Sequence, residues 1–284
     1  MVKIEIDKKN REDLMRLHTA THILNFSARQ ILGNHIWQNG SNLKSESGTL
    51  DITHYDNLTN DEIFEIENLV NKVIFEDKKL IIEELDRNIA EEKYGFVLYQ
   101  GGAIPMKVLR VISIEDNDVE ACGGLHVDST SKVRLLKIID TQKIQDGVVR
   151  IKFAVAQYAL EIIKQKQEKL LNICNTFSVS DSDIEKSSEK FFNEWKERGK
   201  EIDKLKLEIK DSYLNQITSS NTNCFELKNE FDMAFIMELF TEIIKQKQSF
   251  KLISPKFIIA TSEIEITEEF KKSIDKKVFK IYIR

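Results

Sequence analysis

Hydrophobic side chains near the start of the chain recur at the three- and four-residue spacing of an amphipathic helix. Between Asn10 and Gly33 they form a single stripe, made of Leu14, Leu17, Leu24, Ala28 and Ile31. Asn10, together with Asp13, is typical of a helix N-cap, and Gly33 is typical of the residue that follows a helix. We therefore expect one long helix between them.

A second helix is indicated by Thr59 and Glu62, which have the spacing of a capping box and precede an apolar stripe. A short helix is predicted over residues 86–93. Alternating and short apolar runs predict strands over residues 48–55, 79–85, 108–114, 119–122, 133–138 and 148–155. This order of elements predicts an α+β fold, with a mostly antiparallel sheet covered by packed helices.

The pattern changes after residue 155. Charged helices are predicted over residues 158–175 and 184–213, and the Ser- and Asp-rich break between them indicates a long antiparallel helical hairpin. After a polar segment at 219–223, the pattern is that of a small α/β domain. Its predicted strands are 225–227, 257–261 and 278–283, and its predicted helices are 233–247 and 268–276. The expected domains are therefore residues 1–155, 156–218 and 219–284.

Composition narrows the class of protein. Of the 284 residues, 41% are hydrophobic and 31% are charged, which fits a soluble globular protein of two or three units. The net charge of -5 gives no overall attraction to nucleic acid. With three cysteines and no apolar run like a signal peptide or membrane span, we expect a cytoplasmic protein without a disulfide framework.

Two short clusters carry the candidate chemistry. His18 and His22 lie one helical turn apart, and Cys122 and His126 flank a glycine pair much later in the chain. These four residues are drawn from only five histidines and three cysteines, so their pairing indicates a metal site. Nitrogen and sulfur ligands favour zinc (Zn²⁺) over Mg²⁺ or Ca²⁺.

The ligand count alone leaves the role of such a zinc open. A structural zinc is closed by four protein ligands, and four are available here. The glycine pair between Cys122 and His126 instead lets the backbone approach a ligand closely, and a zinc with four protein ligands can still organise a nearby water. The residues therefore support a catalytic and a structural site about equally.

Three further motifs lie between the two ligand pairs, in the segments 37–41 (WQNGS), 50–55 (LDITHY) and 95–102 (GFVLYQGG). Together with the two ligand pairs, residues 10–155 resemble the editing domain of alanyl-tRNA synthetases. The ligand pairs also resemble those of the related free-standing trans-editing proteins. The resemblance implies that His18, His22, Cys122 and His126 bind the metal. Leu125 departs from the family, which usually has threonine there.

This family hydrolyses the ester of tRNA(Ala) mischarged with serine or glycine. The activity is needed because a pocket that accepts alanine cannot strongly reject glycine or serine. The resemblance implies an editing role for Gln38, and Thr21 is a second candidate catalytic residue. In the alternative interpretation, Gln38 only braces its loop and Thr21 only packs on the helix face.

The layout after residue 155 resembles the C-terminal half of a synthetase. We expect the editing subunit of a split alanyl-tRNA synthetase, which works with a separate catalytic subunit and cannot charge tRNA alone. One alternative is a free-standing trans-editing deacylase with an added C-terminal domain. Another is a non-catalytic, zinc-stabilised subunit for tRNA binding or assembly. The end of the chain is basic and suits a phosphate backbone. Its candidate tRNA-binding residues are Lys271, Lys272, Lys276, Lys277 and Lys280.

Overall fold

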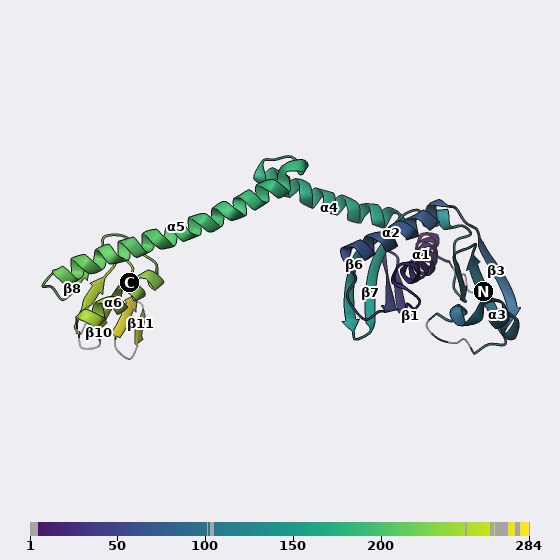
Figure 1. The fold of residues 1–284 in the computed structure, drawn as a ribbon, viewed down its shortest axis with the longest axis horizontal. Helices are drawn as coiled ribbons and strands as arrows, with labels where there is room; N and C mark the ends of the chain where they lie inside the picture. The colour runs from purple at the N-terminus through teal and green to yellow at the C-terminus, as the bar shows by residue number, and fades with distance from the viewer. Residues whose placement is uncertain are drawn as a thin grey trace. The chain divides into compact units, whose positions relative to one another are not determined.

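The computed structural model describes residues 5–100, 102, 105–247, 249–261, 264, 272–275 and 279–283, with only the backbone described for 272–275. The chain divides into two units, Met1–Ile173 and Cys174–Arg284. Figure 1 shows their elements in chain order by colour. In the described ranges, no helix is both long and apolar enough to cross a membrane.

A four-stranded antiparallel sheet and two helices form the main core of the first unit. In spatial order, the strands are β1 (Gln38–Lys44), β2 (Ser47–Thr53), β7 (Val148–Val155) and β6 (Leu136–Gln145). Helices α1 (Lys8–Leu32) and α2 (Asn60–Phe75) pack against each other and against this sheet (Figure 1). Leu17 and Leu24 of α1 and Phe153 of β7 are fully buried in this core.

A second, three-stranded sheet completes the first unit. Strands β3 (Leu80–Asp86), β4 (Val108–Ile114) and β5 (Asp118–Ala121) are antiparallel in that order. Helix α3 (Arg87–Tyr94) and the 3₁₀ turn η1 (Gly95–Leu98) lie between β3 and β4, and the 3₁₀ turn η2 (Thr130–Val133) follows β5. These mixed elements, with antiparallel strands, confirm the α+β class predicted from the sequence.

Two details of the sequence prediction are wrong in this unit. The N-cap of α1 is Asp7, whose Oδ1 accepts a hydrogen bond from the Asn10 amide at 3.1 Å, so Asn10 lies within the first turn. Strand β1 was expected to be a loop, because its sequence QNGSNLK has no alternation of apolar side chains. Its backbone pairs with β2, and this pairing makes it a strand.

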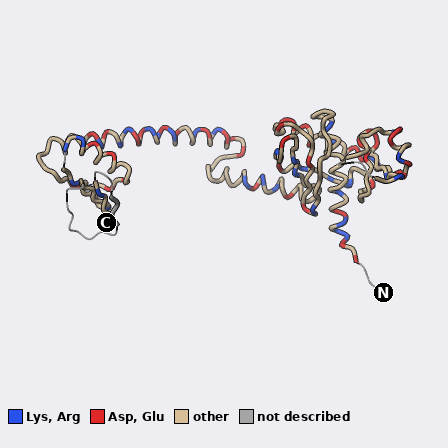
Figure 2. Tube along the Cα trace, turned by 90° about the horizontal axis from the view of Figure 1, so that it is seen from below, with Lys and Arg blue, Asp and Glu red and all other residues tan. Residues whose placement is uncertain are grey.

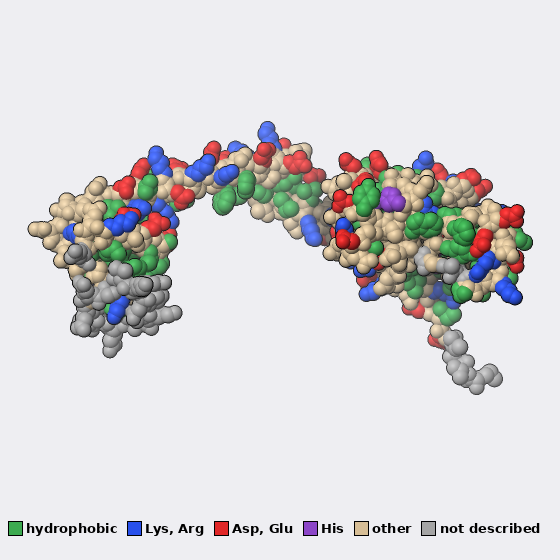
Figure 3. Space-filling model, turned by 60° about the horizontal axis from the view of Figure 1, so that its bottom comes forward, with side chains coloured by type: hydrophobic (Ala, Val, Ile, Leu, Met, Phe, Trp, Pro, Cys, Tyr) green, Lys and Arg blue, Asp and Glu red, His purple; other side chains and the backbone are tan. Residues whose placement is uncertain are grey.

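Two long helices follow the first sheet. They are α4 (Ala156–Phe177) and α5 (Ile184–Ser219), separated by the 3₁₀ turn η3 (Asp181–Asp183). Acidic and basic residues alternate along α5 (Figure 2). Phe191 and Trp195 of this helix are exposed, and Figure 3 shows hydrophobic side chains beside charged ones on the surface. The boundary between the units falls within α4, so the antiparallel pairing of the two helices stays a prediction.

The second unit contains a five-stranded sheet covered by α6 (Met233–Gln246). In spatial order, its strands are β11 (Lys272–Asp275), β12 (Phe279–Ile283), β10 (Phe257–Thr261), β9 (Lys251–Ile253) and β8 (Cys224–Glu226). Only β8 and β9 pair in parallel among these described strands. Tyr213, Leu214 and Ile217 of α5 join the core of this unit. The domain boundaries expected at residues 155 and 218 stay predictions.

The helix expected over residues 268–276 is contradicted where the structure describes this range. Residues 272–275 form β11, which pairs with β12 in an antiparallel register from Lys272 opposite Ile283 to Asp275 opposite Lys280. A neighbouring strand supplies hydrogen bonds that outweigh the helix preference of such a short charged segment. The short strand β9 was also not predicted.

The capping box of α2 gives a test of local stability. Thr59 Oγ1 accepts from the Glu62 amide at 3.3 Å, and Glu62 Oε2 accepts from the Thr59 amide at 2.8 Å. Thr59→Ala should lower the free energy of unfolding by about 1 kcal/mol, because the Glu62 amide loses its acceptor while the bond from the residue 59 amide to Glu62 remains. Urea unfolding measures this change. Thr59→Ser, which keeps the hydroxyl, should retain most of the stability, and equal losses in both variants would contradict the assignment.

Candidate metal centre

The four predicted ligands converge from two elements of the first unit. His18 and His22 lie one turn apart on α1, while Cys122 directly follows β5 and His126 lies in the loop after it. Their ligand atoms all lie within 4.8 Å of one another. Side chains as far apart in sequence as His18 and Cys122, which are 104 residues apart, therefore meet at one point.

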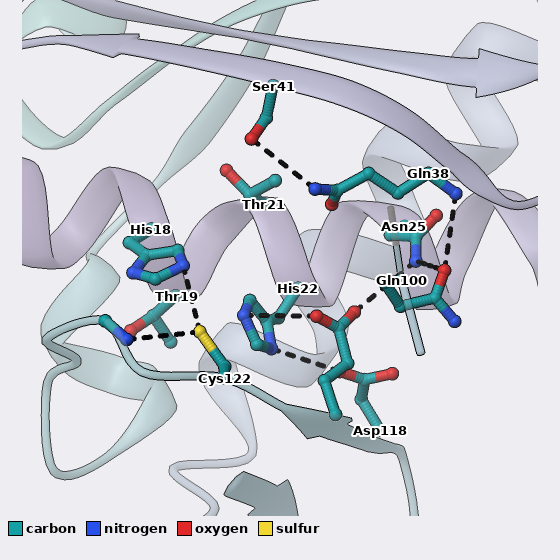
Figure 4. Close-up of polar contacts among 12 residues, drawn as sticks. His18, Thr19, Thr21, His22, Asn25, Gln38, Ser41, Gln100, Asp118 and Cys122 are labelled. Carbon is teal, nitrogen blue, oxygen red and sulfur yellow. Dashed lines mark hydrogen bonds and ion pairs between the residues drawn. The ribbon is translucent and has the colours of Figure 1, made fainter. Parts of the chain in front are cut away.

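The spacing of these atoms suits a tetrahedral ion. Zinc bonds of about 2.0–2.3 Å place neighbouring ligand atoms about 3.3–3.8 Å apart. Cys122 Sγ lies 3.4 Å from His18 Nε2 (Figure 4). His126 Nε2 is buried and has no hydrogen-bond partner among the described residues, which is unusual for a polar atom unless a ligand completes it. The donor set and geometry therefore fit a zinc ion.

Neighbouring groups orient two of the imidazole rings. His18 Nδ1 lies 3.3 Å from the Leu125 carbonyl oxygen, and His126 Nδ1 lies 3.2 Å from Thr19 Oγ1. A proton on each Nδ1 leaves Nε2 free to bind a metal. The Leu125 side chain is 49% exposed, so its backbone rather than its side chain serves the ring of His18. The departure from threonine at this position leaves that backbone contact in place.

In the loop from Cys122 to His126, which carries two candidate ligands, one position has room only for glycine. A Cβ atom on Gly124 would overlap the imidazole of His18, whereas one on Gly123 would meet no atom within 4 Å in the described parts of the chain. Neither glycine has a positive φ, so the requirement at Gly124 comes from close approach and not from backbone conformation. The loop thus packs its backbone directly on a ligand side chain.

Arg110 of β4 holds the same loop from its other side. Its Nη1 donates to the carbonyl oxygens of Cys122 at 2.7 Å and of Gly124 at 2.9 Å. The Cys122 amide in turn donates to the Arg110 carbonyl oxygen at 2.9 Å, which continues the pairing of β4 with β5. Sequence analysis missed this arginine, because its contacts are to backbone atoms and leave no motif.

The protonation states of Cys122 and His126 favour metal binding. Burial by itself would raise the pKa of the Cys122 thiol, but the nearby imidazoles of His126, His18 and His22 outweigh this effect and lower the pKa to about 3. Burial lowers the pKa of His126 to about 4. At neutral pH the cysteine is therefore a thiolate and His126 is neutral, and these are the forms that bind metals.

Two buried carboxylates, which sequence analysis also missed, lie beside His22. Asp118 Oδ2 lies 3.4 Å from His22 Nδ1, and Glu120 Oε2 lies 3.2 Å from His22 Nε2 (Figure 4). Burial tends to lower the pKa of His22, but Glu120 and Asp118 raise it well above its usual value. For Glu120, burial acts in the opposite direction and raises the pKa of the carboxyl group to about 8. The alternation of residues 118, 120 and 122 along one strand face was the available signal.

The predicted catalytic residues lie beside this cluster. Gln38 begins β1 next to a register shift between Gln38 and Gly40, and its Nε2 donates to Ser41 Oγ at 3.5 Å. Thr21 is buried on α1 and points toward Gln38 and Ser41 in Figure 4. Its hydroxyl donates to the Leu17 carbonyl oxygen at 2.8 Å, an ordinary contact for a packing residue. The roles of Gln38 and Thr21 stay predictions.

The predicted tRNA-binding lysines lie in the second unit. Lys271, Lys276 and Lys277 are outside the described residues, and Lys272 is described only by its backbone in β11. Lys280 is half-buried in β12.

Several other lysines of the basic end already have partners. Lys245 pairs with Glu242 at 2.8 Å and Lys256 with Glu230 at 2.6 Å, while Lys247 donates to two backbone carbonyls. The two ion pairs reduce the positive charge that this region offers to phosphate.

The glycine that faces His18 gives a direct test of the ligand loop. Gly124→Ala should weaken Zn²⁺ binding by about tenfold or more, because the imidazole of His18 must move away from the other ligands. Competition with a chromophoric chelator measures the affinity. Gly123→Ala is the matched control and should bind zinc like the parent. Unchanged affinity in the Gly124 variant would show that His18 is not a ligand.

Comparisons with known proteins show which proteins this chain resembles. Residues 109–152, which include Cys122 and His126, match the family described as "Threonyl and Alanyl tRNA synthetase second additional domain". The chain is 41% identical to alanine-tRNA ligase of Methanococcus vannielii over 209 residues, 43% to that of Methanocella arvoryzae over 205, and 45% to that of Pyrococcus abyssi over 208. The matches cover 74%, 72% and 73% of this chain, but only 23% of each relative. The chain is therefore similar to a part of alanine-tRNA ligases and spans about a quarter of the length of these relatives.

Proposed function

We propose that this chain hydrolyses the ester bond of tRNA(Ala) mischarged with serine or glycine, at a zinc ion held by His18, His22, Cys122 and His126. The observation that carries the proposal is the meeting of these four ligand atoms within 4.8 Å. It gains weight because two of them lie in the segment that matches the synthetase second additional domain.

The chemistry of the site suits ester hydrolysis. When bound, zinc would supply Lewis-acid assistance to attack on an ester carbonyl. Cys122 contributes a thiolate, and the neutral ring of His126 contributes a free Nε2. His18 and Cys122 are only half-buried, so this side of the cluster is reachable from solvent, while His22 and His126 anchor it from within.

Selection for serine is assigned to Gln38 within this proposal. Its amide can donate to or accept from the serine hydroxyl, and its bond to Ser41, at 3.5 Å, is long enough to be exchanged for a substrate contact. Alanine lacks that hydroxyl, so correctly charged alanyl-tRNA would gain nothing from this contact and stay intact. Thr21 is the second candidate, and its bond to the Leu17 carbonyl would have to be shared with substrate.

The same proposal includes two partners, tRNA and a catalytic subunit. It assigns tRNA binding in part to the lysines of the second unit. It also includes a separate alanyl-tRNA synthetase catalytic subunit as a partner, because the relatives are alanine-tRNA ligases. Affinity purification of the tagged chain from its native cells, followed by mass spectrometry, tests whether such a subunit accompanies it.

The deciding experiment is hydrolysis by the purified full chain. Zinc content is measured first, and seryl-tRNA(Ala), glycyl-tRNA(Ala) and alanyl-tRNA(Ala) are then compared as substrates. One zinc per chain with rapid loss of serine or glycine and stable alanyl-tRNA is the expected result. Zinc binding without any hydrolysis would instead favour a structural zinc in a tRNA-binding or assembly subunit. Absence of zinc even after reconstitution would overturn the site itself.

Removal of the thiolate separates the catalytic from the structural role. Cys122→Ala should abolish measurable hydrolysis of seryl-tRNA(Ala) while the chain remains folded, because the first unit has a large apolar core that does not depend on the metal. Circular dichroism and single-turnover hydrolysis measure the two effects. Cys224→Ala removes an exposed cysteine and serves as the control. Unfolding of the Cys122 variant would favour a structural zinc, and parental activity would remove Cys122 from the site.

The basic end can be tested in the full chain by its salt dependence. Replacement of Lys271, Lys272, Lys276, Lys277 and Lys280 by glutamine should weaken tRNA binding and flatten the dependence of affinity on salt. Hydrolysis at saturating enzyme should stay near the parental rate, because that measurement isolates the chemical step. A matched control replaces five lysines of the long helices, namely Lys164, Lys166, Lys169, Lys186 and Lys190. Equal weakening by both sets would show only a nonspecific charge effect.

A further inference from the structure

A chain of polar side chains connects the candidate metal ligands to Gln38 (Figure 4). Glu120 contacts His22 with Oε2 at 3.2 Å and accepts from Asn25 Nδ2 with Oε1 at 3.4 Å. Asn25 Nδ2 also donates to Gln100 Oε1 at 3.0 Å, and the same oxygen accepts from the backbone amide of Gln38 at 3.3 Å. The connection therefore passes from α1 and β5 to the first residue of β1.

The contacts of Gln100 fix the orientation of its side-chain amide. Its Nε2 donates to the Val97 carbonyl oxygen in η1 at 2.9 Å, which turns Oε1 toward Asn25 and Gln38. In the reverse orientation, the amide nitrogen of Gln100 would face the N–H donors of Asn25 and Gln38, and its oxygen would face the Val97 carbonyl oxygen. A single orientation thus satisfies all three contacts.

The centre of this connection is shielded from water. Asn25 is fully buried and Glu120 is 4% exposed, so water cannot readily replace a lost partner there. The far end is at a register shift of β1, between Gln38 and Gly40. Regular strand pairing is interrupted at that point, so the direction of Gln38 depends on contacts from outside the sheet. The side chain of Gln100 supplies one of them.

We propose that Gln100 is a positioning residue, which together with Asn25 sets the place of Gln38 relative to the metal ligands and thereby the preference for seryl- over alanyl-tRNA(Ala). This inference rests on the proposed function, in which Gln38 reads the serine hydroxyl. It gives the segment at residues 95–100 a specific role, namely to present one amide oxygen to the backbone of β1. Gln100 itself acts through Gln38 and need not touch the substrate.

Two readouts test this proposal in the zinc-loaded full chain. The first is hydrogen exchange of the Gln38 backbone amide, followed by NMR, in the parent and in Gln100→Ala. The second is kcat/KM for seryl- and alanyl-tRNA(Ala) in Gln100→Ala, Gln38→Ala and the double variant. Gln142→Ala is the matched control, because Gln142 is an exposed residue of β6.

Gln100→Ala should speed exchange of the Gln38 amide by about tenfold, the effect of losing one hydrogen bond. It should also lower the ratio of kcat/KM for seryl- over alanyl-tRNA, and Gln38→Ala should cause no further loss in the double variant. The control should match the parent in both readouts. Unchanged exchange, or additive losses in the double variant, would overturn the proposal.

Two further outcomes keep the test decisive. If the parent shows no hydrolysis, the proposed function fails and the preference assigned to Gln100 fails with it, while hydrogen exchange still decides whether Gln100 holds Gln38. If Gln100→Ala does not fold, Gln100→Met replaces it, because methionine keeps the length of the side chain but lacks the oxygen that accepts from Gln38. Faster exchange of the Gln38 amide in that variant supports the proposal, and unchanged exchange overturns it.

Discussion

Helix α1 packs into the apolar core on one side and carries two candidate metal ligands on the other. The arrangement of the rest of the first unit depends on this double contact. Leu17 and Leu24 lie in the apolar core, while His18, His22 and Asn25 face β5 and the loop after it. Because interiors are close-packed, the apolar contacts fix the rotation of the helix about its axis. The two imidazoles are then presented at defined positions by the same packing that stabilises the unit.

The loop that supplies the other two ligands is held by backbone contacts from both sides. Arg110 donates to two of its carbonyl oxygens, and Gly124 packs against the ring of His18. Its own Leu125 carbonyl then orients that ring. The loop and the helix therefore position each other, and neither pair of ligands is preorganised without the other. Such mutual support explains how a short loop without regular structure can hold a thiolate and an imidazole in place.

The sequence reveals elements with strong periodicity and residues with distinctive chemistry. Strands β4 and β7 begin and end at the predicted residues, and Thr59 and Glu62 form the predicted capping box. The sequence did not predict strand β1 or the strand at residues 272–275. Pairing with a neighbouring strand decides the structure of both segments, and this pairing leaves no local pattern in the sequence. In the candidate site, the roles of Asp118 and Arg110 were not predicted from the sequence, for a related reason.

Aspartate and arginine are common residue types, and the roles of these two residues depend only on the groups that they contact. Asp118 gains its role from a buried imidazole on another element, and Arg110 from carbonyl oxygens that every residue has. Histidine and cysteine pairs are rare enough to be recognised in a sequence, whereas supporting contacts need the fold. The cluster of the four candidate ligands could thus be predicted from the sequence, but the residues that support it could not.

The polar composition of β1 has a consequence for the behaviour of the protein in solution. β1 is at the edge of its four-stranded sheet, so one side of its backbone has no neighbouring strand among those described. An edge rich in hydrophobic side chains would invite another chain to pair with it and start aggregation. The sequence QNGSNLK offers little apolar surface for such growth, and its register shift interrupts the flat edge that a foreign strand would need. The features that hid this strand from sequence analysis therefore also protect the sheet from uncontrolled extension.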